Sequence, residues 1–82
     1  MKFDYYSDNQ IYVSRFPDYS TEDDINVMFS PYGKIKKIMM KPGFAFIDFE
    51  NYDDADDCVF CMDGLYVEGK RMIVQHASKF LI

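Results

Sequence analysis

Residues 42–49, with the sequence PGFAFIDF, constrain the fold more than any other segment, because large and small side chains alternate along them. A strand turns successive side chains to opposite faces. Phe44, Phe46 and Asp48 therefore point to one face, and the residues between them point to the other. A face that carries two aromatic rings and a carboxylate is not the interior of a core. The segment predicts a strand in a sheet whose aromatic side stays uncovered.

Three further segments are predicted strands. Residues 10–16 carry β-branched and aromatic side chains, and residues 71–76 alternate in polarity. Residues 35–41 are separated from the aromatic strand, residues 43–49, only by a turn at residues 41–43. Because this turn is so short, the two strands must form an antiparallel hairpin.

Two segments are predicted helices. The first begins at a cap on Ser20 or Thr21, has an acid three residues further on, carries an apolar stripe at i, i+3 and i+4, and ends at residues 31–33. The second covers residues 51–62, has four aspartates near its start, and ends at the Asp-Gly pair of residues 63–64. The predicted order of elements is therefore βαββαβ.

This order predicts an α+β fold, the ferredoxin-like sandwich, in which right-handed crossovers place two helices on one face of a four-stranded antiparallel sheet. A chain of 82 residues has room for one core. We expect a single domain over residues 8–79, with short terminal extensions at residues 1–7 and 80–82. The sheet face without helices is named the open face here. The side chains expected on it are Tyr12, Lys37, Met39, Lys41, Phe44, Phe46, Ile73 and Gln75.

Charge is distributed in blocks along the chain. The formal net charge is −5, but residues 18–31 and 48–63 hold eleven of the fourteen acids and no base. All nine bases lie in the rest of the chain, together with three acids. The acidic blocks coincide with the predicted helices, so the net charge does not exclude a polyanionic ligand on the open face.

Two segments match sequence motifs of a known superfamily. Residues 42–49 match seven of the eight positions of the longer RNA-recognition-motif signature. Residues 11–13, Ile-Tyr-Val, have the aliphatic, aromatic, aliphatic start of its shorter companion on the first strand. The chain therefore resembles the RNA-recognition-motif superfamily. Pro42 stands where the longer signature has a basic residue, so one contact of the general motif is missing unless Lys41 supplies it.

Within this superfamily the chain is similar to the first RNA-recognition motif of the serine/arginine-rich splicing factors. The resemblance covers residues 10–79. It rests on Tyr12 with Arg15, on residues 32–35, on the short hairpin before residues 43–46, and on residues 54–57 and 73–77. It implies that the domain binds short single-stranded RNA elements and that the chain acts in pre-mRNA splicing in the nucleus.

The residues of the predicted RNA site fall into three groups. Aromatic side chains stack bases, basic side chains neutralise phosphates, and polar groups at the end of the last strand read base edges. The predicted site comprises the rings Tyr12, Phe44 and Phe46 with Met39 beside them, the basic residues Arg15, Lys37, Lys41 and Lys79, and the strand-end residues Gln75, His76 and Ser78. For His76, ordinary packing at the strand end is the alternative.

A second interpretation is a protein-interaction domain of the same fold, whose acidic helices bind a basic or aromatic peptide. The helical count turns Phe60 and Cys61 toward solvent, and these two residues form a candidate docking patch, extended by Phe80 and residues 81–82. Peptide-binding variants of this fold carry an arginine-x-aromatic triplet before the last strand, and residues 65–72 contain none. We expect a monomer, with other splicing factors as candidate partners.

The sequence predicts no enzyme, cofactor, metal site or membrane span. It has one histidine, no phosphate-binding loop and no apolar run near the roughly 20 residues that cross a bilayer. Cys58 and Cys61 provide only half of a tetrahedral zinc site, and their helical spacing disfavours a disulfide. Cys58 is expected to pack inward.

Overall fold

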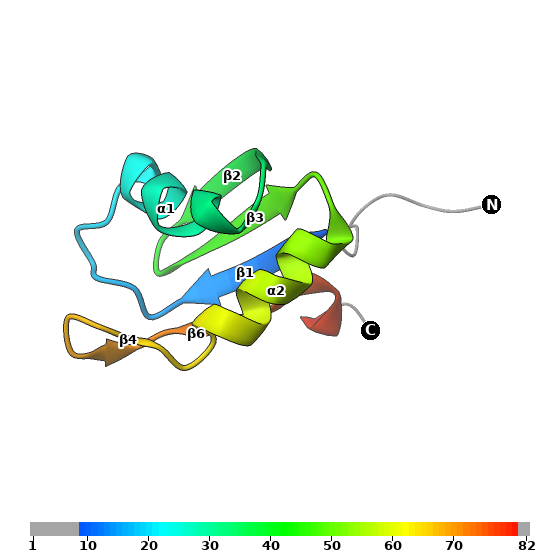
Figure 1. The fold of residues 1–82 in the computed structure, drawn as a ribbon. Coiled ribbons are helices and arrows are strands. Elements are labelled where there is room, and N and C mark those ends of the chain that lie inside the picture. The colour runs from blue at the N-terminus through cyan, green and yellow to red at the C-terminus, as the bar shows by residue number, and fades with distance from the viewer. Residues whose placement is uncertain (1–8, 81–82) are drawn as a thin grey trace.

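The structure is a computed structural model that describes residues 9–80, except for the side chains of Lys79 and Phe80. A four-stranded antiparallel sheet in the order β2-β3-β1-β6 carries two α-helices on one face (Figure 1). This arrangement confirms the predicted fold class. The predicted terminal extensions fall largely outside the described residues. The elements are β1 (Gln10–Ser14), α1 (Glu22–Phe29), the 3-10 turn η1 (Ser30–Tyr32), β2 (Ile35–Lys41), β3 (Phe44–Phe49), α2 (Tyr52–Met62), β4 (Tyr66–Val67), β5 (Lys70–Arg71), β6 (Ile73–His76) and the 3-10 turn η2 (Ala77–Phe80).

Helix α1 is capped by Thr21, one of the two N-caps that the sequence allows. The Asp24 backbone N–H donates to Thr21 Oγ1 at 3.2 Å, and the Thr21 backbone N–H donates to Asp24 Oδ2 at 2.9 Å. This reciprocal pair is a capping box. Three acids in the first turn also interact favourably with the positive end of the helix dipole.

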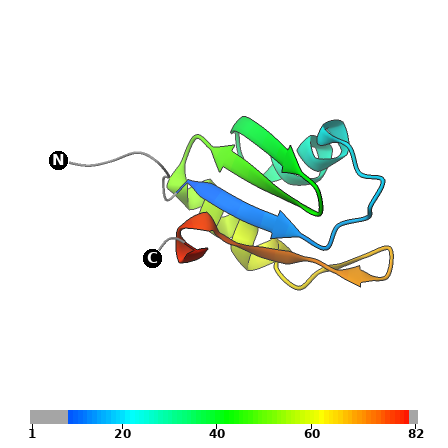
Figure 2. The same cartoon turned by 180° about the vertical axis from the view of Figure 1, so that it is seen from behind.

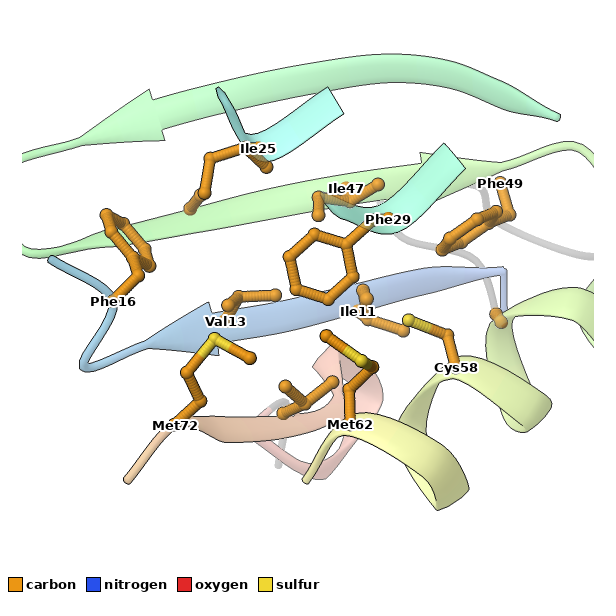
Figure 3. Close-up of a cluster of buried hydrophobic side chains, with 13 residues drawn as sticks. Ile11, Val13, Phe16, Ile25, Phe29, Ile47, Phe49, Cys58, Met62 and Met72 are labelled. Atoms are coloured by element: carbon orange, nitrogen blue, oxygen red, sulfur yellow. The ribbon is translucent and has the colours of Figure 1, made fainter. Parts of the chain in front are cut away.

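The hydrophobic core lies between the sheet and the helices (Figure 3). Every second residue of β1 and β3 points into it, as the alternation predicts. Ile25 and Phe29 reach it from α1, and Cys58 reaches it from α2. Its buried members are Ile11, Val13, Phe16, Ile25, Phe29, Ala45, Ile47, Phe49, Ala55, Cys58, Met62, Met72 and Val74.

Two strand boundaries differ from the prediction by two residues. β1 ends at Ser14 rather than at residue 16, because Arg15 adopts a left-handed backbone conformation with φ of 64°. The predicted last strand, residues 71–76, is divided. Arg71 belongs to β5, and β6 begins only at Ile73.

The β4–β5 hairpin was not predicted from the sequence. Glu68 and Gly69 both have positive φ, 51° and 86°, which is the geometry of a tight two-residue hairpin turn. The hairpin is held against the loop after β1 at two points. Lys70 Nζ donates to Asp18 Oδ1 at 3.0 Å, and the Tyr19 hydroxyl donates to the Glu68 carboxylate.

Gly33 lies where η1 passes close to α2, and we expect its replacement by alanine to destabilise the fold. Its backbone is extended, with φ of 162°, so space decides the outcome. An added Cβ would lie 2.3 Å from Asp54 Oδ2 and 2.5 Å from Asp54 Cβ. The Gly33→Ala variant should lose about 1–3 kcal/mol of unfolding free energy in urea denaturation, because α2 must shift to make room.

The Asp54→Ala background is the control for this prediction. It removes the carboxylate but keeps the Asp54 Cβ position, which would still lie 2.5 Å from the new methyl group. The double variant should therefore recover only part of the loss. An unchanged denaturation midpoint for Gly33→Ala would contradict the prediction.

Candidate nucleic-acid interface

The strand register arranges the open face in rows that run across the sheet. Residues directly opposite each other in antiparallel strands project to the same face. The central row consists of Met39, Phe46, Tyr12 and Gln75, one residue from each of β2, β3, β1 and β6. The neighbouring row consists of Lys41, Phe44, Ser14 and Ile73. The sequence-predicted residues of these rows are thus brought together by four strands.

Three rings form the centre of the open face. The ring centroids of Tyr12 and Phe44 are 5.7 Å apart, those of Tyr12 and Phe46 are 5.8 Å apart, and those of Phe44 and Phe46 are 5.7 Å apart. The rings are mutually tilted by 32° to 88°, so they form a triangle of contacts rather than a parallel stack. Each of the three residues remains partly exposed. The cluster therefore combines internal support with accessible aromatic surface.

The α-helices leave this cluster uncovered. In β3, Ala45, Ile47 and Phe49 are fully buried against the helices, while Phe44 and Phe46 point the other way. Turning the molecule by 180° brings the sheet to the front, with α1 and α2 behind it (Figure 2). Within residues 9–80, both α-helices thus lie on the side of the sheet opposite the rings.

The third row of the open face is polar. Lys37, Asp48 and Gln10 lie opposite one another on β2, β3 and β1. Gln10 Nε2 donates to Asp48 Oδ1 at 2.8 Å, so one carboxylate oxygen is already engaged. Sequence reasoning missed Gln10, although its position two residues before Tyr12 gave the signal. The row places one basic and one acidic side chain beside the aromatic cluster.

Basic side chains border the open face, whereas the acids gather on the helices. Lys37 and Lys41 are exposed on β2, on the same face as the rings. The acidic first turns belong to α1 and α2, on the opposite side of the sheet (Figure 2). The structure therefore separates the acidic and basic segments in space as well as in sequence. A polyanion that approaches the rings meets mainly basic side chains.

Arg15 follows β1 directly and lies at the end of the open face. Its Nε donates to the Arg71 backbone carbonyl at 3.0 Å, which ties the side chain to the β4–β5 hairpin. The residue is exposed. Its guanidinium is thus located beside Ile73 and Gln75, with which it lines one pocket.

The His76 side chain lies away from the open face, although the predicted RNA site includes it as a residue at the end of the last strand. Alternation along β6 puts Gln75 on the open face, so His76 points toward α2. His76 Nε2 lies 3.0 Å from Asp56 Oδ1, and its ring stacks on Tyr52 with a centroid distance of 5.4 Å and an interplanar angle of 13°. The alternative interpretation, packing at the strand end, describes its observed position.

The remaining predicted residues follow β6. Ser78 lies in η2 and is partly exposed, so the chain turns there instead of continuing the strand. The side chains of Lys79 and Phe80, like residues 81–82, lie outside the described part of the structure. The roles predicted for them stay predictions.

The two cysteines have different environments. Cys61 is exposed, whereas Cys58 is buried in the core, as predicted. Burial raises the pKa of the Cys58 thiol to about 12, because a thiolate is poorly solvated there. In residues 9–80 no group of three or more His, Cys, Asp or Glu side chains is placed to hold a metal ion.

Among the large apolar side chains of residues 9–78, Phe60 is the most exposed, with 88% of its surface accessible. It projects from α2 into solvent, as the helical count predicts.

The two α-helices of the described residues have 8 and 11 residues, and neither has the length and apolar character that a membrane span requires.

Comparison with known proteins identifies the family. The sequence profile of the RNA recognition motif family matches residues 11–73. The chain is 36% identical over 66 residues to the probable splicing factor, arginine/serine-rich 2, of Caenorhabditis elegans, covering 80% of this chain and 24% of that protein. It is 37% identical over 68 residues to human serine/arginine-rich splicing factor 4, covering 83% of this chain and 14% of that protein. The chain thus spans about a quarter or less of these two relatives.

Solved structures agree with this assignment. The structure of Pes4 RRM3 superposes with a TM-score of 0.81 at 30% identity, covering 84% of this chain and 90% of that one. The structure of the Nab3 RRM, described for its recognition of cis elements in non-polyadenylated RNAs, superposes with a TM-score of 0.78 at 29% identity, covering 88% and 97%. The chain belongs to the RNA recognition motif family and, within it, resembles the motifs of the serine/arginine-rich splicing factors.

Proposed function

We propose that this domain binds single-stranded RNA across the open face, with bases stacked on Tyr12, Phe44 and Phe46. The observation that carries the proposal is the ring triangle, with centroids 5.7 to 5.8 Å apart, partly exposed at the centre of a sheet that matches the RNA recognition motif. Stacking tolerates different bases because every base has a flat π-face. Only unpaired nucleotides expose that face.

The surroundings of the rings support the same ligand. Lys37, Lys41 and Arg15 border the open face and are exposed, so they can neutralise phosphates of a strand that crosses it. Lys41 lies opposite Phe44, next to the position where Pro42 replaces the usual basic residue. Gln75, at the end of the central row, offers both a donor and an acceptor to a base edge.

NMR shift mapping with a pool of short randomised RNAs tests this proposal. Shifts confined to the four-stranded sheet are expected, because stacked bases change the ring-current environment of its strands. Double-stranded RNA of the same composition serves as the control, since its bases are already stacked. Shifts confined to α1 and α2 would reject the open face as the RNA site.

We also propose that the protein acts in pre-mRNA splicing, in the nucleus, as a non-enzymatic RNA-binding protein that is monomeric. Support comes from relatives that are named splicing factors, although the chain spans only part of each of them. Crosslinking in cells followed by sequencing of the bound RNA should recover intron-containing transcripts. Recovery of mature transcripts alone, in the cytoplasm, would contradict this role.

A second candidate function is protein binding on α2. Phe60 is 88% exposed, and the outer side of the same helix carries Asp53, Asp56 and Asp57, all of them exposed. No basic residue occurs between residues 48 and 63. An aromatic ring surrounded by carboxylates suits an arginine-rich peptide, because a guanidinium can stack on the ring and pair with an acid.

Replacing Phe60 by serine should weaken binding of a short arginine-rich peptide several-fold and leave unfolding free energy within about 0.5 kcal/mol of the wild type. The side chain is almost fully exposed, so its loss removes little packing. Val27→Ser, at a residue of α1 that is 72% exposed, is the matched control. If Phe60→Ser retains the wild-type peptide affinity in calorimetric titration, α2 is not the docking surface.

A further inference from the structure

A pocket adjoins the open face beyond β6. It lies between the residue after β1, the β4–β5 hairpin and β6, and it has a volume of about 700 Å³. Ile73 and Gln75 belong both to this pocket and to the rows of the open face, so the two surfaces are continuous. In Figure 2, β1 ends beside the segment that leads from the hairpin into β6. A strand of RNA lying on the rings can therefore extend into the pocket.

Arg15 reaches this pocket from a backbone conformation that is rare for a residue with a side chain. Its φ of 64° lies in the left-handed region, which is unfavourable for residues other than glycine, asparagine and aspartate. The bond from Arg15 Nε to the Arg71 carbonyl, 3.0 Å long, holds the side chain in place. This bond uses only Nε, and the two terminal amino groups of the guanidinium keep their four donors.

Arg71 contributes a second guanidinium to the same pocket. It lies against Gly64, where an added Cβ would be 3.3 Å from Arg71 Nη2. Asp63 is the acid that lines the pocket, and its Oδ1 accepts the Val74 backbone N–H at 2.9 Å. Among the side chains of residues 9–78, the ion pairs are Lys70 with Asp18 and His76 with Asp56, so neither arginine is neutralised by one.

An aromatic ring completes the lining. Tyr66 of β4 is 71% exposed at the pocket, and Gln75 lines its border with the open face. Two guanidiniums present paired N–H donors that match the oxygens of a phosphate, and an exposed ring offers a stacking surface for a base. The RNA site predicted from the sequence includes neither Tyr66 nor Arg71.

We propose that this pocket holds one further nucleotide of the bound RNA, with its phosphate between Arg15 and Arg71 and its base against Tyr66. The inference rests on the proposed RNA binding by the open face and extends it by a subsite that the three rings do not provide. Continuity with Ile73 and Gln75 favours a nucleotide of the same strand over a free phosphate.

RNAs of increasing length, measured by fluorescence anisotropy, test the subsite. An RNA of about three nucleotides covers the rings. Adding one or two nucleotides, at either end in turn, should raise wild-type affinity about tenfold at one of the ends. Arg71→Ala keeps the backbone carbonyl that Arg15 contacts, and Tyr66→Ala removes an exposed ring. Both variants should bind the short RNA nearly as well as the wild type and lose most of the gain with length.

Lys36→Ala is the control for charge, because it removes one exposed positive charge from a residue that does not line the pocket. It should keep the gain with length. Inorganic phosphate that competes as well as the added nucleotide would assign the pocket to a free anion and overturn the proposal. The proposal would also be overturned if Arg71→Ala lost the same affinity for short and long RNA, or if the variants kept the full gain in affinity with RNA length. If the wild type binds no RNA, the proposed function fails as well. If the wild type binds the short RNA but its affinity does not rise with RNA length, only the subsite is contradicted.

Discussion

Replacing Phe44 and Phe46 together by alanine is expected to weaken binding of single-stranded RNA at least thirtyfold. Each base stacked on an aromatic side chain contributes about 1–3 kcal/mol, so two rings contribute about 2 kcal/mol or more, which corresponds to about thirtyfold in affinity. The loss should be larger than this minimum, because the two rings also support Tyr12, whose centroid is 5.7 Å from that of Phe44 and 5.8 Å from that of Phe46. Fluorescence anisotropy with a pool of short RNAs measures the effect.

The matched control for this double variant is Phe60→Ala. It removes a ring of the same kind from α2, on the other side of the sheet, where 88% of the side chain is exposed. It should leave RNA affinity unchanged within about twofold. Circular dichroism must show that the double variant is folded at the titration temperature. A folded double variant with wild-type affinity would remove the basis of the stacking proposal.

Replacing Phe29 by alanine is expected to cost about 3–5 kcal/mol of unfolding free energy, a large part of the 5–15 kcal/mol typical of a whole domain. Phe29 is fully buried at the end of α1, and its ring lies between the helices and the sheet, near Ile11 and Ile47 (Figure 3). Its truncation removes apolar surface and leaves a cavity between packed layers, which such a small core cannot refill.

Urea denaturation followed by circular dichroism measures this loss, and Phe60→Ala again provides the comparison. The two substitutions are chemically identical and both lie in helices, but one ring is 0% exposed and the other is 88% exposed. The control should change stability by no more than about 0.5 kcal/mol. Similar losses for both variants would contradict the assignment of Phe29 to the core.

Features that depend on neighbours in sequence were predicted well. The capping box joins Thr21 to Asp24, three residues on, and spacing alone reduced the possible caps to Ser20 and Thr21. The faces of β3 follow from its period of two, which depends only on the local backbone. The same argument placed Phe60 outside and Cys58 inside on α2.

Features that local signals describe poorly were missed. The β4–β5 hairpin turns at Glu68 and Gly69, and this pair is not the Asn-Gly or Asp-Gly dipeptide that marks such turns most strongly. The hairpin is bound to the rest of the domain through hydrogen bonds with Asp18 and Tyr19, about fifty residues away in the sequence. Alternation along β6 turns His76 toward α2, but its partner Asp56 lies 20 residues away, and no local signal identifies it.

The sequence by itself determined the order of the two α-helices and the four strands of the main sheet, the face of each of these strands and the aromatic character of the open face, because these depend on the backbone period and on caps a few residues apart. Only the tertiary structure decided which side chains meet. Arg15 binds the carbonyl of Arg71, 56 residues further on, and His76 meets Asp56, 20 residues before it. Such contacts depend on how strands pair and where loops turn, and no local periodicity encodes them.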